Sequence, residues 1–361
     1  MSTLKVNAIR SVLATSDAVT LANNGTCTAN ITNNLSNRNL IINGNMVCSQ
    51  RASSFANITD AYCLDRFRFR NNNGVAGTFT VSQSTDTPDE FANSLKVAVG
   101  TQDAGLAAGE TFLISTRLEG QNLQSLAKGT SSAKKSVLSF YVKTNRAGTY
   151  AVFVYDNDNN RQFSTTYTVS NTNWNRYTID VPADTTGAYD NDNNRSLDIY
   201  WYLGAGTNST SGTLASSWQS YVAADSAVGQ VNFADSTSNE FYITGIQYEV
   251  NESGVATDFE HRSFAEEFAL CQRYYQQLGL PKDYTSGVTS SYIYRSYYLP
   301  VQQRANGAGS VVSQCRYYSN GSGTNFTPTV SPQTDKVLVQ GTSLSNANGF
   351  VDGTIGLDAE L

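Results

Sequence analysis

The chain has 361 residues, of which 40% are hydrophobic and only 15% are charged, against roughly 25% charged residues in an ordinary soluble domain. Lys and Arg number 24 and Asp and Glu number 30, so the formal net charge is −6; the scattered basic residues argue against nucleic-acid binding and against adhesion to an anionic membrane. Because no run of about 18 apolar residues occurs, the sequence predicts no membrane-spanning segment.

The composition favours strands and turns. Ser, Thr, Asn and Gly replace the missing charge, and the chain contains 21 Tyr and 16 Phe. Aromatic and β-branched residues suit a pleated surface, whereas Asn and Gly tolerate the dihedral angles of tight turns. The chain is therefore predicted to be mainly β.

Residues 1–38 form a segment of their own character. Short alternating runs at residues 4–8 and 18–21 are interleaved with Ser, Asn and Gly, so the segment has little apolar surface to bury by itself. It is either a disordered arm or an arm that orders during assembly, around copies of itself or another protein, and we favour ordering on assembly. Because its start lacks the basic and continuous apolar regions of a secretory signal, we expect synthesis in a cytoplasm without export by the general secretory route.

Many short strands divided by polar turns are predicted over residues 39–262. The candidate strands are 39–44, 64–69, 77–82, 137–143, 148–155, 163–169, 174–181, 197–203, 231–233 and 241–249. The apolar runs 137–143 and 148–155 flank the turn-like residues 144–147, which predicts a β-hairpin. Strands at this spacing favour an antiparallel sandwich, and we predict the jelly-roll type.

One helix is predicted at residues 263–280. Ser263 and Glu266 form a capping-box pattern, the run 267–278 contains good helix formers, and a Gly and a Pro beyond it provide a stop. Spacings of four and three place one apolar stripe along this helix, made of Phe264, Phe268, Cys271, Tyr275 and Leu278. We favour packing of this stripe on the protein's own sheet over a seam between subunits, because two heptads are short for a coiled coil.

Residues 281–361 return to a β pattern and form a second β unit that is too long for a linker.

Aromatic residues are the candidate binding groups, because Tyr and Trp combine a flat apolar face, which stacks on a sugar ring or fills a protein interface, with a polar handle. The candidates are Tyr200, Trp201, Tyr202, Tyr292, Tyr294, Tyr297 and Tyr298. In each alternating set, half of the rings are expected to face the core instead.

No catalytic or cofactor site is indicated. His261 is the only histidine, and no serine–carboxylate pair or second imidazole accompanies it, so we expect a structural contact. No phosphate-binding, nucleophile-elbow or zinc-protease motif occurs, and we predict neither a cofactor nor enzymatic activity. The five cysteines are widely spaced and odd in number, so buried apolar side chains are expected rather than disulfides: Cys27, Cys48, Cys63, Cys271 and Cys315.

Two acidic loops, residues 156–160 and 190–194, are weak candidates for calcium. Their oxygen-bearing side chains at every second position resemble the start of an EF-hand loop, and the candidate ligands are Asp156, Asp158, Asp190 and Asp192. Neither loop has the glycine at the sixth position or the glutamate at the twelfth, so exposed turns are the favoured interpretation. A glycosidase would need two carboxyl groups facing one another across a cleft, and no such pair is indicated.

Two blocks of sequence carry a family resemblance. The first holds Asn-Leu-Ile-Ile-Asn-Gly-Asn at residues 39–45, then Gln50 and Arg51, then Tyr-Cys-Leu-Asp-Arg-Phe at residues 62–67. The second block extends over residues 244–250 (Thr-Gly-Ile-Gln-Tyr-Glu-Val) and 256–275, ending in Glu-Glu-Phe-Ala-Leu-Cys-Gln-Arg-Tyr-Tyr. Together they resemble the opening and the close of a module found in phage tail-fibre and related virion proteins.

This resemblance implies a carbohydrate-binding-like jelly roll with a capping helix and a further C-terminal β region. Residues 2–7 resemble the start of marine and cyanobacterial phage fibre proteins, which implies that residues 1–38 attach to another virion protein such as a tail adaptor or nozzle. Membership implies a homotrimer on the virion, made in the host cytoplasm, that contacts host surface glycans. No catalytic or sugar-binding position carries over, because the motifs look architectural.

Two alternatives remain open within this class of proteins. One is a head-decorating or head-fibre protein on the same kind of particle. The other is a polysaccharide-degrading tailspike, which requires a cleft with paired carboxylates.

Overall fold

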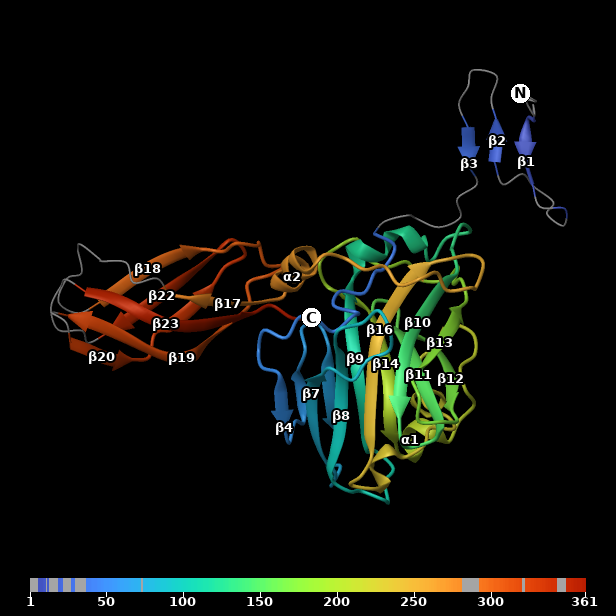
Figure 1. The fold of residues 1–361 in the computed structure, drawn as a ribbon, viewed down its shortest axis with the longest axis horizontal. Coiled ribbons are helices and arrows are strands. Elements are labelled where there is room, and N and C mark those ends of the chain that lie inside the picture. The colour runs from blue at the N-terminus through green and yellow to red at the C-terminus, as the bar shows by residue number, and fades with distance from the viewer. Residues whose placement is uncertain are drawn as a thin grey trace.

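The structure is a computed structural model that describes residues 6–10, 12, 19–21, 27–29, 37–72, 74–280, 292–319, 322–342 and 349–361. Figure 1 shows a two-layered sandwich of long strands, a C-terminal β unit that extends from it beside the helix α2, and a small N-terminal sheet. None of the helices in the described ranges has the length and apolar character needed to cross a membrane.

The first layer of the sandwich is a six-stranded sheet with the order β13-β10-β16-β8-β7-β4. Its strands are β4 (Ser54–Ala56), β7 (Thr78–Ser84), β8 (Ser94–Thr101), β10 (Ser136–Thr144), β13 (Asn175–Val181) and β16 (Glu240–Val250). The second layer is a seven-stranded sheet with the order β15-β12-β11-β14-β9-β6-β5. Its strands are β5 (Asp60–Tyr62), β6 (Arg68–Asn72), β9 (Thr111–Glu119), β11 (Gly148–Asp156), β12 (Arg161–Val169), β14 (Arg195–Ala205) and β15 (Gln219–Ser220).

The chain passes repeatedly from one layer to the other, as from β8 to β9, from β9 to β10 and from β10 to β11. The strand pairs in both layers are antiparallel. Short helical segments connect some of the strands: η1 (Gly120–Leu126), α1 (Thr207–Thr210), η2 (Ala223–Asp225) and η3 (Phe233–Asp235). The predicted mainly β fold with an antiparallel jelly-roll sandwich is confirmed.

The predicted hairpin between residues 137–143 and 148–155 is wrong. β10 pairs with β13 and β16, whereas β11 pairs with β12 and β14 in the opposite sheet. Phe140 of β10 and Val152 of β11 both belong to the core between the layers. The turn is therefore an arch across the core, since each strand has an apolar inner face that needs the other layer to cover it.

The core of the sandwich is rich in aromatic residues. Trp201 is fully buried at its centre, and its ring meets Phe140 edge-on with the ring centroids 5.8 Å apart. The Phe79 ring packs against Phe69, with the ring centroids 5.2 Å apart, and against Phe112, with the centroids 4.7 Å apart. Full burial of side chains of this size stabilises the fold by about 1.5–3 kcal/mol each relative to exposure.

The helix α2 (Phe264–Gln272) is shorter than the predicted helix at residues 263–280. Its predicted N-cap is confirmed, because the Ser263 side chain accepts a hydrogen bond from the Glu266 amide at 3.3 Å. The prediction of one apolar stripe along a single helix is wrong, because two of its members, Tyr275 and Leu278, lie beyond α2 in the strand β17 (Tyr275–Gly279). Within α2 the buried side chains are Glu267 and Cys271, while Phe264 is 62% exposed and stacks on Phe268.

The C-terminal unit consists of two small sheets with the orders β17-β23-β19-β20 and β18-β22-β21. Besides β17, its strands are β18 (Tyr292–Tyr298), β19 (Ala308–Ser319), β20 (Ser322–Phe326), β21 (Thr329–Pro332), β22 (Lys336–Thr342) and β23 (Gly349–Asp358). A second apolar core, which includes Cys315, Tyr317, Val339 and Ile355, holds the unit together. In the N-terminal segment, β1 (Ala8–Ile9), β2 (Val19–Leu21) and β3 (Cys27–Ala29) pair with one another.

The two blocks that resemble virion proteins meet in space. The Asn39 side chain donates to the Ile246 carbonyl and accepts from the Tyr248 amide, each at 3.1 Å. The Arg51 guanidinium lies 3.8 Å from the centre of the Tyr275 ring. These motif residues therefore join the first strands of the sandwich to its last strand and to the C-terminal unit.

A buried ion pair completes this junction. Arg66 and Glu360 form an ion pair, and both side chains are at most 4% exposed. The Arg66 guanidinium also lies 3.4 Å from the centre of the Tyr274 ring. Arg304 donates to the carbonyls of Ala359 and Asn193, at 2.6 Å and 2.9 Å, and so bridges the end of the chain and the sandwich.

Candidate functional site

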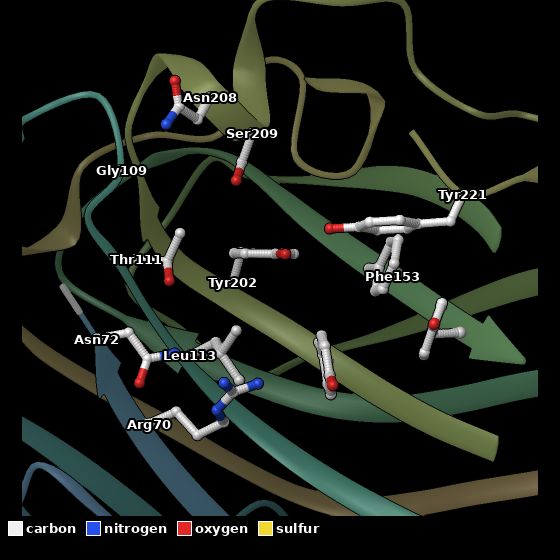
Figure 2. Close-up of a pocket in the computed structure, with 12 residues that line it drawn as sticks. Arg70, Asn72, Gly109, Thr111, Leu113, Phe153, Tyr202, Asn208, Ser209 and Tyr221 are labelled. Carbon is white, nitrogen blue, oxygen red and sulfur yellow. The ribbon is translucent and has the colours of Figure 1, made fainter. Parts of the chain in front are cut away.

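A hollow lies on the outer face of the seven-stranded sheet, turned away from the core. Its volume is about 400 Å³. The lining residues come from four adjacent strands, the loop before β9, the helix α1 and the segment after β15, and they are Arg70, Asn72, Gly109, Thr111, Leu113, Phe153, Tyr155, Tyr200, Tyr202, Asn208, Ser209 and Tyr221. Figure 2 shows Tyr202 and Phe153 between Tyr221 on one side and Arg70 with Asn72 on the other. We call this hollow the aromatic cleft.

The strand register explains how these residues come together. Phe153 of β11 is paired with Tyr200 of β14, and Tyr202 is paired with Leu113 of β9. Leu113 is in turn paired with Arg70 of β6. Since neighbouring strands keep paired residues on the same face, one continuous surface of side chains crosses all four strands.

The floor of the aromatic cleft is a small apolar cluster separate from the main core. It consists of Leu113, Ala151, Phe153, Tyr200, Tyr202 and Ala227. The Phe153 ring stacks on Tyr200 with the centroids 5.4 Å apart and on Tyr155 at 5.9 Å. Phe153, Tyr200 and Tyr202 are only 2%, 7% and 6% exposed, so this outer face carries a packed aromatic layer where a sandwich ordinarily has polar side chains.

A buried carboxylate holds the floor in place. Asp198 is fully buried and accepts hydrogen bonds from the Tyr200 hydroxyl at 2.5 Å and from Arg195 Nε at 2.7 Å. Burial, together with the negative charge of Asp198, raises the pKa of Tyr200 well above its ordinary value. Tyr200 thus stays neutral and its ring orientation is fixed by its hydroxyl.

Tyr155 and Tyr221 form one wall of the cleft. Their rings meet edge-on with the centroids 5.5 Å apart, and Tyr221 is the most exposed of the lining rings, at 43%. Asn160 supports both of them: its side-chain oxygen accepts from the Tyr155 hydroxyl at 2.9 Å, and its carbonyl accepts from the Tyr221 amide at 3.0 Å. This wall is anchored on one side and open to a ligand on the other.

The rim is built from two loops that are bonded to each other. The Asn208 amide donates to the Ala108 carbonyl at 2.9 Å, and the Gly206 amide donates to Glu110 at 2.8 Å. A Cβ atom at Gly206 would lie 2.0 Å from the Ala107 carbonyl oxygen, so the close approach of the loops requires glycine. Figure 2 shows the Ser209 and Tyr221 hydroxyls directed into the hollow from this rim. The cleft is thus largely preformed.

Arginines surround the opposite edge, on β6 and β9. Arg68 pairs with Asp60 at 2.6 Å, and Arg117 lies 3.8 Å from Asp198. Burial and the positive charges of Arg117 and Arg70 lower the pKa of Arg68, although Asp60 opposes them. Arg70 itself lies 6.0 Å from the centre of the Tyr200 ring. Arg68 and Arg117 thus each lie beside a carboxylate, whereas Arg70 lines the cleft.

Two of the predicted aromatic candidates lie in the cleft. Tyr200 and Tyr202 line it, but Trp201 between them points into the core, because successive residues of a strand face opposite sides. In the C-terminal unit, Tyr297 packs against the second core and Tyr298 is 77% exposed. The side chains of Tyr292 and Tyr294 lie outside the described residues.

The sequence did not single out the remaining aromatic residues, Phe153, Tyr155 and Tyr221, or the cation Arg70. Phe153 and Tyr155 alternate within the predicted strand 148–155, which was a usable signal. Tyr221 and Arg70 come from distant segments, and no local pattern marks them.

The weak calcium candidates are engaged in other contacts. Asp156 is buried and pairs with Lys128 at 2.5 Å, which corrects its assignment to an exposed turn. Asp158 accepts from the Asp190 amide at 3.0 Å, and Asp192 accepts from the Asn194 amide at 2.9 Å. Among the described residues, no group of three or more His, Cys, Asp or Glu side chains is placed to hold a metal ion.

The single histidine and the described cysteines make structural contacts. The His261 ring packs on Phe259 at 4.9 Å and on Phe91 at 5.3 Å, measured between ring centroids. The buried free cysteines are Cys48, Cys63, Cys271 and Cys315, and the side chain of Cys27 lies outside the described residues. Burial raises the pKa of Cys63 to about 12, so this thiol is not a nucleophile.

Among the described residues, no pair of carboxylates faces across the aromatic cleft. None of the described residues that line it is Asp or Glu. Asp65 accepts from Gln50 at 2.8 Å, and Glu119 pairs with Arg273 at 2.9 Å, so both carboxylates are engaged in other contacts. A smaller hollow of about 140 Å³ on the six-stranded sheet contains Asp86 and Glu240, which pair with Lys143 and Lys96.

Comparison with known proteins adds fold similarity only. The sequence matches no protein-family model and no curated protein. A structure described as "CBM4 structure and function" aligns with 58% of this chain and 98% of its own, at 10% identity and a TM-score of 0.32. A family 11 carbohydrate-binding module from Clostridium thermocellum, in complex with a β-1,3-1,4-mixed-linked tetrasaccharide, aligns with 58% of this chain and 98% of its own. The sequence identity is 12% and the TM-score is 0.28. A putative sugar-binding protein from Bacteroides thetaiotaomicron aligns with 59% of this chain and 100% of its own, at 12% sequence identity and a TM-score of 0.32.

Proposed function

We propose that this chain is a non-enzymatic glycan-binding protein of a phage particle, and that the aromatic cleft is its sugar-binding site. The observation that carries the proposal is the set of flat rings on the outer face of the sheet, Phe153, Tyr155, Tyr200, Tyr202 and Tyr221, around a hollow of about 400 Å³.

Flat rings suit sugars because the C–H faces of a pyranose pack on an aromatic surface, while hydroxyl and amide groups at the edges bind the sugar hydroxyls. The cleft offers both kinds of group. Its floor is apolar, and Asn72, Thr111 and Ser209 stand around it. The bonded rim and the Asp198 contacts hold the rings in place before a ligand arrives, which reduces the entropy lost on binding.

The phage assignment is supported by the two sequence blocks at residues 39–67 and 244–275. We infer a tail fibre that assembles as a homotrimer, attaches to another virion protein through residues 1–38, and contacts host surface glycans. Several linked copies on one particle raise the apparent affinity far above that of one weak site. A head-decorating or head-fibre protein is the second candidate, since the same blocks do not distinguish the two positions.

A polysaccharide-degrading tailspike is disfavoured by the composition of the cleft. Glycoside hydrolysis ordinarily uses two carboxyl groups on either side of the scissile bond. The described lining of the aromatic cleft supplies hydroxyls, amides and one guanidinium, none of which replaces that pair.

The glycan proposal is tested by binding of the full chain to a glycan array, with Tyr221→Ala as the test variant. Tyr221 is half exposed, so its loss is tolerated by the fold, and we expect about tenfold weaker binding, equivalent to about 1.4 kcal/mol. Tyr298→Ala is the matched control, because Tyr298 is an exposed tyrosine of the C-terminal unit. Equal loss in both variants, or loss only in Tyr298→Ala, contradicts the assignment to the cleft.

The virion proposal has a separate test. Antibodies against the chain are expected to label purified phage particles, and light scattering is expected to give the mass of a trimer. Absence of the chain from particles contradicts the proposal, and a monomer in solution contradicts the trimeric fibre.

A further inference from the structure

We infer that the aromatic cleft selects acidic glycans, and that Arg70 recognises the sugar carboxylate. This inference rests on the proposed function and adds the chemical class of the ligand to it.

Arg70 is a half-buried cation that lacks a partner. Its Nε atom is inaccessible to solvent and has no hydrogen-bond partner, and within the part of the chain that the structure describes no carboxylate forms an ion pair with the guanidinium. Its guanidinium lies 6.0 Å from the centre of the Tyr200 ring, and Asp60, its register partner on β5, forms its ion pair with Arg68 instead. A partly desolvated charge without a partner is unfavourable, so a ligand carboxylate would remove a cost that the free protein bears.

The neighbouring arginines behave differently. Arg68, two residues earlier on the same strand, pairs with Asp60 at 2.6 Å. Arg195 donates to Asp198 at 2.7 Å on the floor side of the cleft. The fold therefore supplies carboxylates to the arginines around the cleft but leaves Arg70, which lines it, uncompensated.

The electrostatics of this edge favour an anion at Arg70. No described Asp or Glu lines the cleft, and Arg68 and Arg117 each lie beside a carboxylate of their own, so Arg70 is the charge that a ligand anion can meet. The protein as a whole has a net charge of −6, which repels acidic polymers except at such a local patch. A guanidinium also matches a carboxylate in shape, because its planar fork donates two parallel hydrogen bonds.

The position of Arg70 orients the ligand. Tyr155 and Tyr221 lie over β11 and beyond it, whereas Arg70 and Asn72 lie on β6 at the other end of the cleft, as Figure 2 shows for Tyr221, Arg70 and Asn72. A sugar stacked on the rings would thus extend across the strands with its acidic group at β6. Asn72 is paired in register with Thr111, and together they flank Arg70 with groups for the sugar hydroxyls.

The test compares the full chain with Arg70→Gln on an array of paired glycans: uronate oligosaccharides, their methyl esters, and sulfated and neutral glycans. We expect the wild type to prefer uronates over their methyl esters by at least tenfold, and Arg70→Gln to lose this preference. Binding of the uronates is also expected to weaken in 0.5 M salt, which screens charge. Arg68→Gln is the matched control on the same strand and is expected to keep the preference.

The other outcomes separate the two proposals. Binding by the wild type to neutral glycans alone, to sulfated but not carboxylated glycans, or to uronates with no effect of Arg70→Gln overturns the role of Arg70 while the glycan-binding function stands. No binding of the wild type to any glycan overturns both. Thermal melting of Arg70→Gln at or above the wild-type temperature excludes misfolding as the cause of lost binding.

Discussion

The hydroxyl of Tyr200 donates a hydrogen bond of 2.5 Å to Asp198, a carboxylate with no exposure to solvent. Asp198 also accepts a hydrogen bond of 2.7 Å from Arg195 Nε. A buried carboxylate is stable only when charged and polar donors surround it, and here one of those donors is a ring of the cleft floor. The position of the floor is thus tied to a buried charge network beside it on the same face of the sheet.

Replacing Asp198 by Asn is expected to loosen this floor. The amide keeps the shape of the side chain but removes the charge that pairs with Arg195, so we predict a loss of about 1–3 kcal/mol of folding free energy and weaker glycan binding. Urea unfolding and titration calorimetry measure the two effects. Asp180→Asn is the control, because Asp180 forms an exposed pair with Lys135 and is expected to change stability by less than about 1 kcal/mol. Equal effects of the two substitutions would refute the role of Asp198.

A second prediction concerns the pH dependence of stability. Burial raises the pKa of Asp65 to about 6, although Gln50 and Arg51 act in the opposite direction. Because the folded state then binds a proton more tightly than the unfolded state, the contribution of Asp65 to stability is largest at low pH and is lost as the pH rises through about 6.

Between pH 7 and pH 5 this group alone is expected to increase the free energy of unfolding by about 1 kcal/mol. Asp65→Asn removes the titration, so its stability should follow a flatter pH profile than that of the wild type over this range. Urea unfolding at pH 7, 6 and 5 provides the comparison. Parallel profiles for the two proteins would show that Asp65 does not titrate there.

A third prediction addresses the junction of the two units. Glu360→Gln leaves the buried Arg66 without its charge partner, and breaking a buried pair in this way costs about 3–5 kcal/mol. Asp358→Asn is the control: Asp358 pairs with Arg51 but is 41% exposed, so a loss below about 1 kcal/mol is expected. If the two variants unfold at the same urea concentration, the Arg66–Glu360 pair does not hold the junction.

A fourth prediction distinguishes the two faces of α2. Phe264→Asp changes an exposed side chain and is expected to alter stability by no more than about 0.5 kcal/mol, whereas Cys271→Asp places a charge in the fully buried face and is expected to prevent stable folding. Circular dichroism and urea unfolding measure both. Severe destabilisation by Phe264→Asp would mean that the apolar stripe predicted from sequence packs inward after all.

The class of fold could be predicted from sequence, but its long-range pairing could not. Alternation and turn residues over residues 39–262 indicated an antiparallel sandwich. The connection from β10 to β11 looks locally like a hairpin, because the partners that separate the two strands, β13, β16, β12 and β14, lie further along the chain. Likewise the helix ends at Gln272 since β17 pairs with β23, which begins at Gly349.

The site could be predicted in part for the same reason. Tyr200 and Tyr202 were recognisable as aromatic residues of one strand, but whether they or Trp201 face outward depends on which side the second sheet covers. Arg70 and Tyr221 reach the cleft through β6 and the segment after β15, at opposite ends of the sheet order. Their juxtaposition is a property of the register and is invisible in a local pattern.

The most direct test of the account is a crystal structure of the full chain with the oligosaccharide that binds best on the array. The account predicts a sugar ring packed against the rings of Tyr202 and Tyr221 in the aromatic cleft, with its acidic group toward Arg70. A ligand bound at Tyr298 of the C-terminal unit, or an aromatic cleft left empty while the sugar occupies another surface, would contradict it.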